Sequence, residues 1–98
     1  MTIEKNISGG SAVLSLTGWL DSQSAPELGQ AVEALGPGIT SLVLDLTGLE
    51  YTASAGIRQI VSAYKQMNGA LTLRNVSPEV MDVLNMTGLG KKLHIEQS

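Results

Sequence analysis

A short hydroxyl-rich segment at residues 51–56, with the sequence YTASAG, holds the side chains best placed to do chemistry. It separates an apolar run of strand length at 42–46 from an amphipathic helical pattern, so a helix must begin near Ser54. One interpretation is that the Ser54 hydroxyl caps this helix by accepting a hydrogen bond from the backbone N–H of Gly56 or Ile57. The other is that Ser54 is phosphorylated, because a helix N-terminus offers unpaired N–H groups and partial positive charge to an anion. The two interpretations can coexist in two states of the protein.

Other patterns in the sequence do not support catalysis. His94 is the only histidine and there is no cysteine, so we predict a packing or surface role for His94 and no metal site. The glycines at 9–10 and 88–90 match no phosphate-binding motif. Asp21 and Asp45 could approach each other near the strand ends, but no nucleophile accompanies them. We therefore expect neither an enzyme nor a cofactor.

The composition indicates one small domain with an aliphatic core. The 98 residues leave no room for a second core, so residues 1–98 are predicted to form a single domain. Hydrophobic residues make up 43% of the chain without any Phe, and the lack of Cys fits a reducing compartment. No apolar run reaches membrane-spanning length and no signal-peptide core is present, which predicts a cytoplasmic protein without membrane contact. The net charge of −3 argues against nucleic acid as a partner.

Alternating hydrophobic periods predict strands and helices in turn. The first strand pair is an antiparallel hairpin, and the predicted strands are 2–7, 11–17, 42–46, 70–75 and an edge strand at 91–95. The near-continuous apolar run of the third strand indicates burial on both faces in the middle of a sheet. Helices are predicted at 25–35, 55–68 and 78–87. Ser24 is expected to cap the first helix with Glu27 as its capping-box partner, and Ser77 to cap the third.

Strands that alternate with helices imply βαβ crossovers, and hence an α/β fold with a mixed, mostly parallel sheet and helices packed on it. The loops that follow parallel strands all emerge at one edge of the sheet. Residues 19–23, 47–54 and 75–77 should therefore lie close together at a working edge. Trp19 is expected either on this edge beside Ser54 or folded onto the first helix.

The motifs along the chain resemble those of STAS domains, the fold of bacterial anti-sigma factor antagonists and of the cytoplasmic domains of sulphate transporters. The motifs are GWLD at 18–21, LVLDLTGLEYTASAGIRQIVSAYKQM at 42–67, SP at 77–78 and MTGL at 86–89. They cover essentially the whole chain, which implies a single STAS-like domain. ASAG at 53–56 resembles the family motif that opens a helix, with Ser54 in the place of the family's phosphoacceptor. Ala53 departs from the family, which often has Asp or a further Ser there.

The resemblance implies an anti-sigma factor antagonist, a partner-switching binding protein without catalysis of its own. Unphosphorylated, such a protein binds an anti-sigma factor that is also a serine kinase, and so frees the sigma factor. That kinase phosphorylates the serine corresponding to Ser54, which ends the complex, and a metal-dependent serine phosphatase reverses the modification. The partner-binding surface implied by the resemblance comprises Trp19, Asp21, Ser22, Thr52, Ala53, Ser54, Ala55, Gly56 and Arg58.

Three other functions stay open on the sequence alone. One is a STAS subunit or scaffold of a larger complex, such as a stress-signalling assembly or a lipid-transport ATPase, that contacts its partner without a phosphate cycle. Another is a ligand-sensing module, although no polar cluster in the sequence suggests a ligand. An enzyme is the third, and no catalytic pattern supports it.

Overall fold

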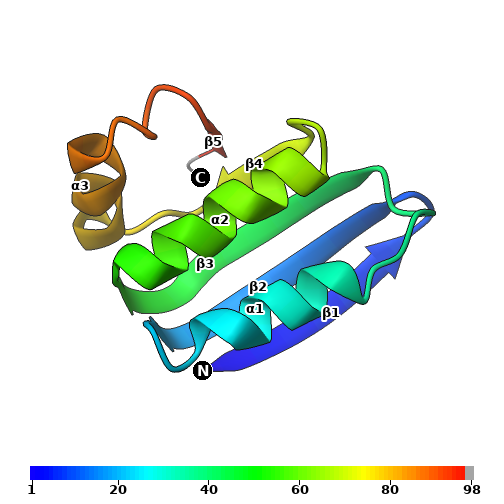
Figure 1. Cartoon of the computed structure of the whole chain (residues 1–98), viewed down its shortest axis with the longest axis horizontal. Coiled ribbons are helices and arrows are strands. Elements are labelled where there is room, and N and C mark those ends of the chain that lie inside the picture. The colour runs from blue at the N-terminus through cyan, green and yellow to red at the C-terminus, as the bar shows by residue number, and fades with distance from the viewer. Residues whose placement is uncertain (97–98) are drawn as a thin grey trace.

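Five strands form a single mixed sheet in the computed structural model, which describes residues 1–96 (Figure 1). Their order across the sheet is β1-β2-β3-β4-β5. β1 pairs antiparallel with β2 and the later pairs are parallel, which confirms the predicted mostly parallel sheet and antiparallel first hairpin. The strands are β1 Thr2–Ser8, β2 Ser11–Leu20, β3 Ser41–Thr52, β4 Leu71–Arg74 and β5 His94–Glu96. The last strand thus begins later than predicted, and residues 97–98 of the predicted domain lie outside the described residues.

Three helices within the described residues occupy the predicted places. They are α1 Ala25–Glu33, α2 Ser54–Gln66 and α3 Pro78–Met86, each ending slightly earlier than predicted. The start of α2 differs by one residue from the predicted start at 55. Figure 1 shows α1 and α2 lying side by side across one face of the sheet.

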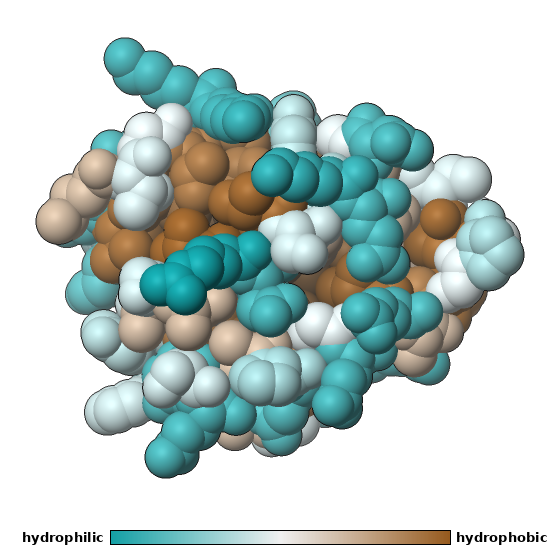
Figure 2. Space-filling view, in the orientation of Figure 1, coloured by the Kyte–Doolittle hydropathy of each residue, from teal (hydrophilic) through white to brown (hydrophobic). Residues whose placement is uncertain are grey.

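The hydrophobic core lies between this face of the sheet and the helices. On β3, Leu42, Leu44 and Leu46 are at most 1% exposed, whereas the alternating Val43 and Asp45 are only half-buried. The prediction that this strand is buried on both faces is therefore wrong, because α1 and α2 cover the same face and leave the other one open. On the covered side, Figure 2 shows hydrophilic side chains over much of the surface with apolar patches between them.

β2 and β3 run further than the hydrophobic pattern predicts. The sequence predicts loops at 19–23 and 47–54, whereas β2 and β3 pair as far as Leu20 opposite Thr52. Register shifts around Gly18, whose φ is +103°, interrupt the apolar alternation without ending the strand. Much of the predicted working edge is therefore held by backbone pairing instead of lying on loops.

Two helices, α1 and α3, have a serine at the N-cap position and a proline in the first turn, but their cap hydrogen bonds differ. Ser77 caps α3 as predicted, accepting a hydrogen bond of 3.3 Å from the N–H of Val80. Ser24 occupies the N-cap position of α1 in a helical conformation and makes no cap bond, so the predicted capping box with Glu27 is not formed. The Ser24 hydroxyl instead donates to the Trp19 carbonyl at 2.7 Å and closes the turn between β2 and α1.

Candidate functional site

α2 begins at Ser54, with Ala53 in the N-cap position and in an extended conformation (φ −105°, ψ 176°). The N–H groups of Gly56 and Ile57 both donate to the Ala53 carbonyl, at 2.9 and 3.1 Å. The Ser54 side chain is exposed and makes no hydrogen bond within residues 1–96. The interpretation of Ser54 as an N-cap is therefore wrong, because Ala53 occupies the N-cap position and Ser54 is the first helical residue.

The positive end of α2 is open beside Ser54. In the described chain, the backbone N–H groups of Ser54 and Ala55 have no hydrogen-bond acceptor. The first turn of the helix contains no acidic side chain, so nothing in that turn opposes an anion. Two free donors and the partial charge of the helix terminus suit the oxygens of a phosphate group.

Close packing beneath Ser54 determines where this helix end lies. The Ala53 N–H donates to the Leu20 carbonyl at 3.0 Å, which ties the start of α2 to the end of β2. A Cβ on Gly56 would lie 2.7 Å from Leu20 Cγ and would also collide with Thr52 Oγ1, so glycine fits best there. Thr52 itself is only 2% exposed. Two of the predicted partner contacts, Thr52 and Gly56, therefore lie beneath the surface that a partner could touch.

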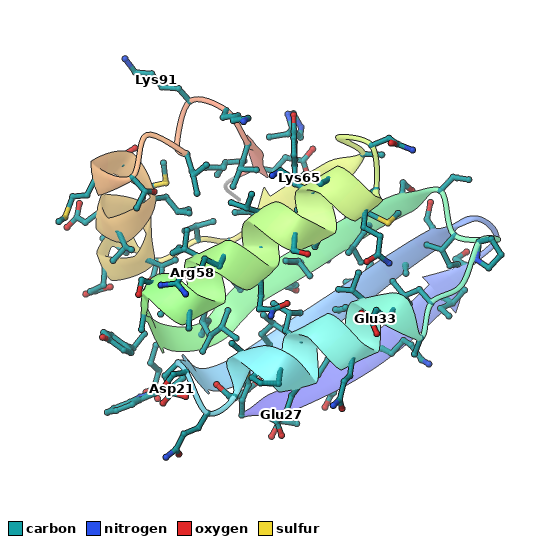
Figure 3. All side chains as sticks on the ribbon, in the orientation of Figure 1. Asp21, Glu27, Glu33, Arg58, Lys65 and Lys91 are labelled. Carbon is teal, nitrogen blue, oxygen red and sulfur yellow. The ribbon has the colours of Figure 1, made fainter. Side chains whose placement is uncertain are left out.

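The turn between β2 and α1 is built around Asp21. Its Oδ1 accepts hydrogen bonds from the N–H of Gln23 at 3.0 Å, and from the N–H and the hydroxyl of Ser24 at 3.1 and 3.2 Å. The Ser24 N–H contributes most to holding the pKa of Asp21 below its ordinary value. Ser22 is exposed in this turn. Asp21 thus shapes the turn, and Figure 3 places it at the same end of the molecule as Arg58.

Two exposed aromatic side chains pack together at the ends of β2 and β3. Trp19 opposes Tyr51 in the register, and the two ring centroids lie 5.5 Å apart with the ring planes tilted by 58°. Trp19 is 57% exposed and Tyr51 is 48% exposed. Both point away from the core because the next residues, Leu20 and Thr52, are buried. The alternative in which Trp19 folds onto α1 is therefore wrong.

Arg58 lies on α2 one turn after Ser54. Residues four positions apart on a helix share a face, so an anion on Ser54 would lie within reach of the Arg58 guanidinium. Arg58 is exposed, and it forms no ion pair with another residue in the described part of the chain. Its charge is therefore available to a partner or to a phosphate.

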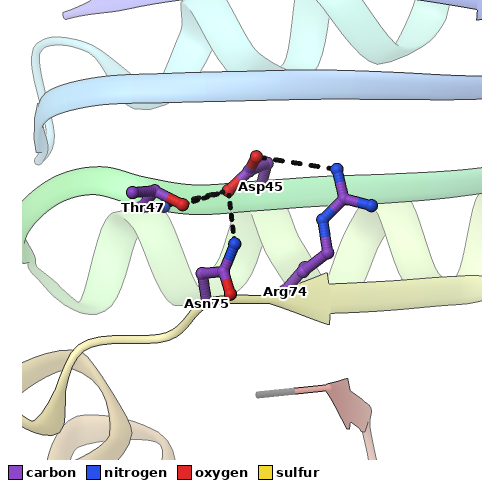
Figure 4. Close-up of polar contacts among 4 residues, drawn as sticks. All are labelled: Asp45, Thr47, Arg74 and Asn75. Atoms are coloured by element: carbon purple, nitrogen blue, oxygen red, sulfur yellow. Dashed lines mark hydrogen bonds and ion pairs between the residues drawn. The ribbon is translucent and has the colours of Figure 1, made fainter. Parts of the chain in front are cut away.

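Asp45 belongs to a separate polar cluster that joins β3 to β4 (Figure 4). Its Oδ1 accepts hydrogen bonds from the Thr47 hydroxyl at 2.6 Å and the Asn75 amide at 3.4 Å, and its Oδ2 lies 3.6 Å from the Arg74 guanidinium. The Thr47 hydroxyl is the main cause that lowers the pKa of Asp45. Asp45 lies midway along β3 whereas Asp21 follows the end of β2, so the fold does not bring the two carboxylates together. The cluster is a structural contact between two strands.

The remaining titratable groups do not assemble into a site. Over residues 1–96, no three side chains of the metal-ligating types His, Asp or Glu gather closely enough to hold an ion. His94 is exposed, as predicted, and its Nε2 lies 3.4 Å from the Glu96 carboxylate. No helix in the described stretch is both long enough and apolar enough to cross a bilayer.

Tyr51 and Glu50 fall within the predicted working edge at 47–54 but are absent from the partner-binding residues that the resemblance implies. Both are exposed at the end of β3, where they share a hollow with Trp19. A signal was present, because Tyr and Thr favour strands and the segment at 49–52 contains both. This signal indicates a longer third strand, but it does not indicate which residue of β2 lies opposite Tyr51.

Known proteins resemble the chain over most of its length. A family model described as "Mlab, STAS domain" matches residues 3–95. BtrV of Bordetella bronchiseptica, which carries the name of an anti-sigma factor antagonist, is 32% identical over 83 residues. This match covers 81% of the chain and 72% of BtrV.

Solved structures resemble the whole fold. A protein of Thermotoga maritima, described as an anti-sigma factor antagonist, superimposes with a TM-score of 0.89 at 20% identity, over 98% of this chain and 86% of that one. The anti-sigma factor antagonist SpoIIAA of Bacillus has been solved in unphosphorylated and phosphorylated forms. Its unphosphorylated form gives a TM-score of 0.86 at 17% identity, over 99% of this chain and 88% of that one. At these identities the likeness establishes the fold.

Proposed function

The chain belongs to the STAS domain family, and we propose that it acts there as an anti-sigma factor antagonist that is switched by phosphorylation of Ser54. The observation that carries this proposal is the exposed Ser54 hydroxyl at the open N-terminus of α2, beside the unpaired N–H groups of Ser54 and Ala55. Unphosphorylated, the protein binds an anti-sigma factor that is also a serine kinase, and the sigma factor is released. The relatives that carry the name of anti-sigma factor antagonists support this role.

The proposed partner surface surrounds Ser54. Thr52 and Gly56 contribute indirectly, because they hold the start of α2 against the sheet. Ala53, Ala55 and Asp21 are half-buried and give the surface its shape. The side chains that a partner reaches most easily are those of Trp19, Ser22, Ser54 and Arg58.

Phosphorylation would change the binding energy far more than the fold. A phosphate adds about two negative charges and three acceptor oxygens. On the free protein these oxygens would face two unpaired N–H groups and lie within reach of Arg58, which stabilises the phosphorylated state. In an interface that excludes water, a charge without a partner costs roughly several kcal/mol, so the kinase complex dissociates. A serine phosphatase then restores the binding form.

A STAS subunit of a larger complex is the second candidate, and Ala53 favours it. The residue before Ser54 lacks the carboxylate or hydroxyl that the family often has there. In this alternative the same edge contacts its partner permanently, within a stress-signalling assembly or a lipid-transport ATPase. The family model described as "Mlab, STAS domain" is compatible with both candidates.

Incubation with candidate anti-sigma factor kinases and labelled ATP separates the two functions. We expect phosphate on Ser54 and none on Thr52, a hydroxyl two residues earlier that is only 2% exposed. Mass spectrometry of the digested protein locates the phosphate. Phosphate on Thr52 alone, or a stable complex with such a kinase in which no serine is modified, would favour the permanent subunit.

A further inference from the structure

The pair of Trp19 and Tyr51 is open to solvent next to the proposed switch. A hollow of about 530 Å³ is lined by Trp19, Glu50 and Tyr51. A second hollow, of about 360 Å³, also borders Trp19 and is lined by Met1, Trp19, Asp21, Gln23, Ser24 and Glu27. The aromatic faces can therefore be reached by a side chain of another molecule.

Carboxylates border both hollows and no basic side chain does. Glu50 borders the first and Asp21 and Glu27 border the second, whereas none of the six Lys and Arg residues of the chain lines either. Across the described residues, Glu50 and Glu27 form no ion pair. The contacts of Asp21 inside its turn all use Oδ1, which leaves Oδ2 free. Across residues 1–96, the carboxylates that border the two hollows form no ion pair and can therefore receive a cation from another molecule.

We propose that an aromatic shelf, consisting of Trp19, Tyr51 and Glu50, receives an arginine or lysine side chain from the protein partner that engages Ser54. The inference rests on the proposed function, since it gives the chemistry of that partner. A cation over an indole face is attracted by the ring quadrupole, and a neighbouring carboxylate strengthens the contact. Arginine fits best, because its planar guanidinium stacks on Trp19 while its N–H groups donate to Glu50.

The shelf is continuous with the proposed partner surface. Tyr51 precedes Ser54 by three residues, and Trp19 opposes Tyr51 across β2 and β3. One partner can therefore cover the shelf and the start of α2 together. A second copy of this chain is a poorer occupant, because its own shelf carries the same carboxylates and the chain has nine acidic residues against six basic ones.

Trp19 is the only tryptophan, so its fluorescence and the NMR signal of its Nε1–H report directly on the shelf. The probes are two peptides blocked at both ends, Gly-Arg-Gly-Arg-Gly and the neutral Gly-Gln-Gly-Gln-Gly. We expect the arginine peptide to shift both signals and to saturate at millimolar concentration. The glutamine peptide should leave both signals unchanged.

Two matched substitutions test the role of the carboxylate. Glu50→Gln should weaken binding of the arginine peptide about threefold to tenfold, because it removes the charge and keeps the shape. Glu33→Gln is the control, since Glu33 is exposed on α1 and lines neither hollow, and it should bind the peptide as the wild type does. Circular dichroism verifies that both variants keep the fold.

Equal responses to the two peptides, or no effect of Glu50→Gln, would overturn the proposal that a basic side chain occupies the shelf. Trp19 signals that change with protein concentration in the absence of peptide would assign the shelf to a second copy of the chain. That result would also overturn the proposal of a basic partner side chain. The peptide assay does not involve Ser54, so the two proposals fail separately. Phosphorylation of Ser54 without peptide binding rejects only the shelf, and peptide binding without phosphorylation rejects only the switch.

Discussion

Replacing Gly56 with alanine tests the close packing of the first turn of α2 against the ends of β2 and β3. The added Cβ would lie 2.7 Å from Leu20 Cγ and 2.8 Å from the Leu20 carbonyl oxygen, and would also collide with Thr52 Oγ1. That carbonyl cannot move aside freely, because it accepts the Ala53 N–H at 3.0 Å. Overpacking of this kind costs about 1–3 kcal/mol, and the higher helix propensity of alanine offsets about 1 kcal/mol. Because the Leu20 carbonyl is held in place, the upper part of this range, about 2–3 kcal/mol, applies. After the offset, we expect Gly56→Ala to lower the free energy of unfolding by about 1–2 kcal/mol.

Urea denaturation followed by Trp19 fluorescence measures this loss. Gly38→Ala is the matched control, because a Cβ at Gly38 has no atom within 4 Å and its φ lies outside the left-handed region. This control should be neutral or stabilise by about 0.4–1 kcal/mol through the unfolded chain. In Gly29→Ala the Cβ would meet the flexible Gln59 side chain, which can move away, so this variant should lose less than Gly56→Ala. A Gly56→Ala variant as stable as the wild type would refute the close packing of α2.

The polar contacts give further predictions. Asp45 has a folded-state pKa below its ordinary value of 3.8, so its contribution to stability is present above that pH and is lost as the pH falls through the folded-state pKa. Asp45→Asn should therefore make the urea midpoint fall less steeply with decreasing pH, and an unchanged slope would contradict this role. Ser77→Ala should cost about 1 kcal/mol because Ser77 caps α3, whereas Ser54→Ala should change the free energy of unfolding by less than about 0.5 kcal/mol. Equal losses in thermal or urea denaturation would contradict the assignment of the caps.

The order of the elements follows from the sequence, because each apolar stripe or run must bury one face. The ends of β2 and β3 do not follow in the same way. Gly18 and Gly48 look like turn residues, yet Gly18 sits in a register irregularity with φ of +103° and a Cβ on Gly48 would meet Thr17 Oγ1 at 2.9 Å. Strand register depends on pairing with a segment distant in the chain, and a local pattern does not contain that information. The contact between Trp19 and Tyr51 depends on that register and was therefore not predictable from local pattern.

The helix starts show a finer limit of sequence reasoning. Ser24, Ser54 and Ser77 all lie at or beside a helix start, but Ser77 alone among the three accepts a cap hydrogen bond. The difference lies in the backbone, since Ser77 is extended (φ −68°, ψ 157°), Ser24 is helical, and Ser54 is already inside α2. The pattern locates a hydroxyl near each start. It does not distinguish the N-cap from the first helical residue. This difference of one residue decides whether the Ser54 hydroxyl caps α2 or stays free of hydrogen bonds.

The most direct test of the switch measures stability and partner binding for one substitution, Ser54→Asp. A carboxylate at the first residue of α2 interacts favourably with the helix dipole, so the free energy of unfolding should rise by about 0.3–1 kcal/mol. Binding to the serine-kinase anti-sigma factor, measured by isothermal titration calorimetry, should nevertheless weaken by more than about a hundredfold, because the charge is buried against the partner. Ser54→Ala should bind as the wild type does. Undiminished binding by Ser54→Asp would contradict the switch.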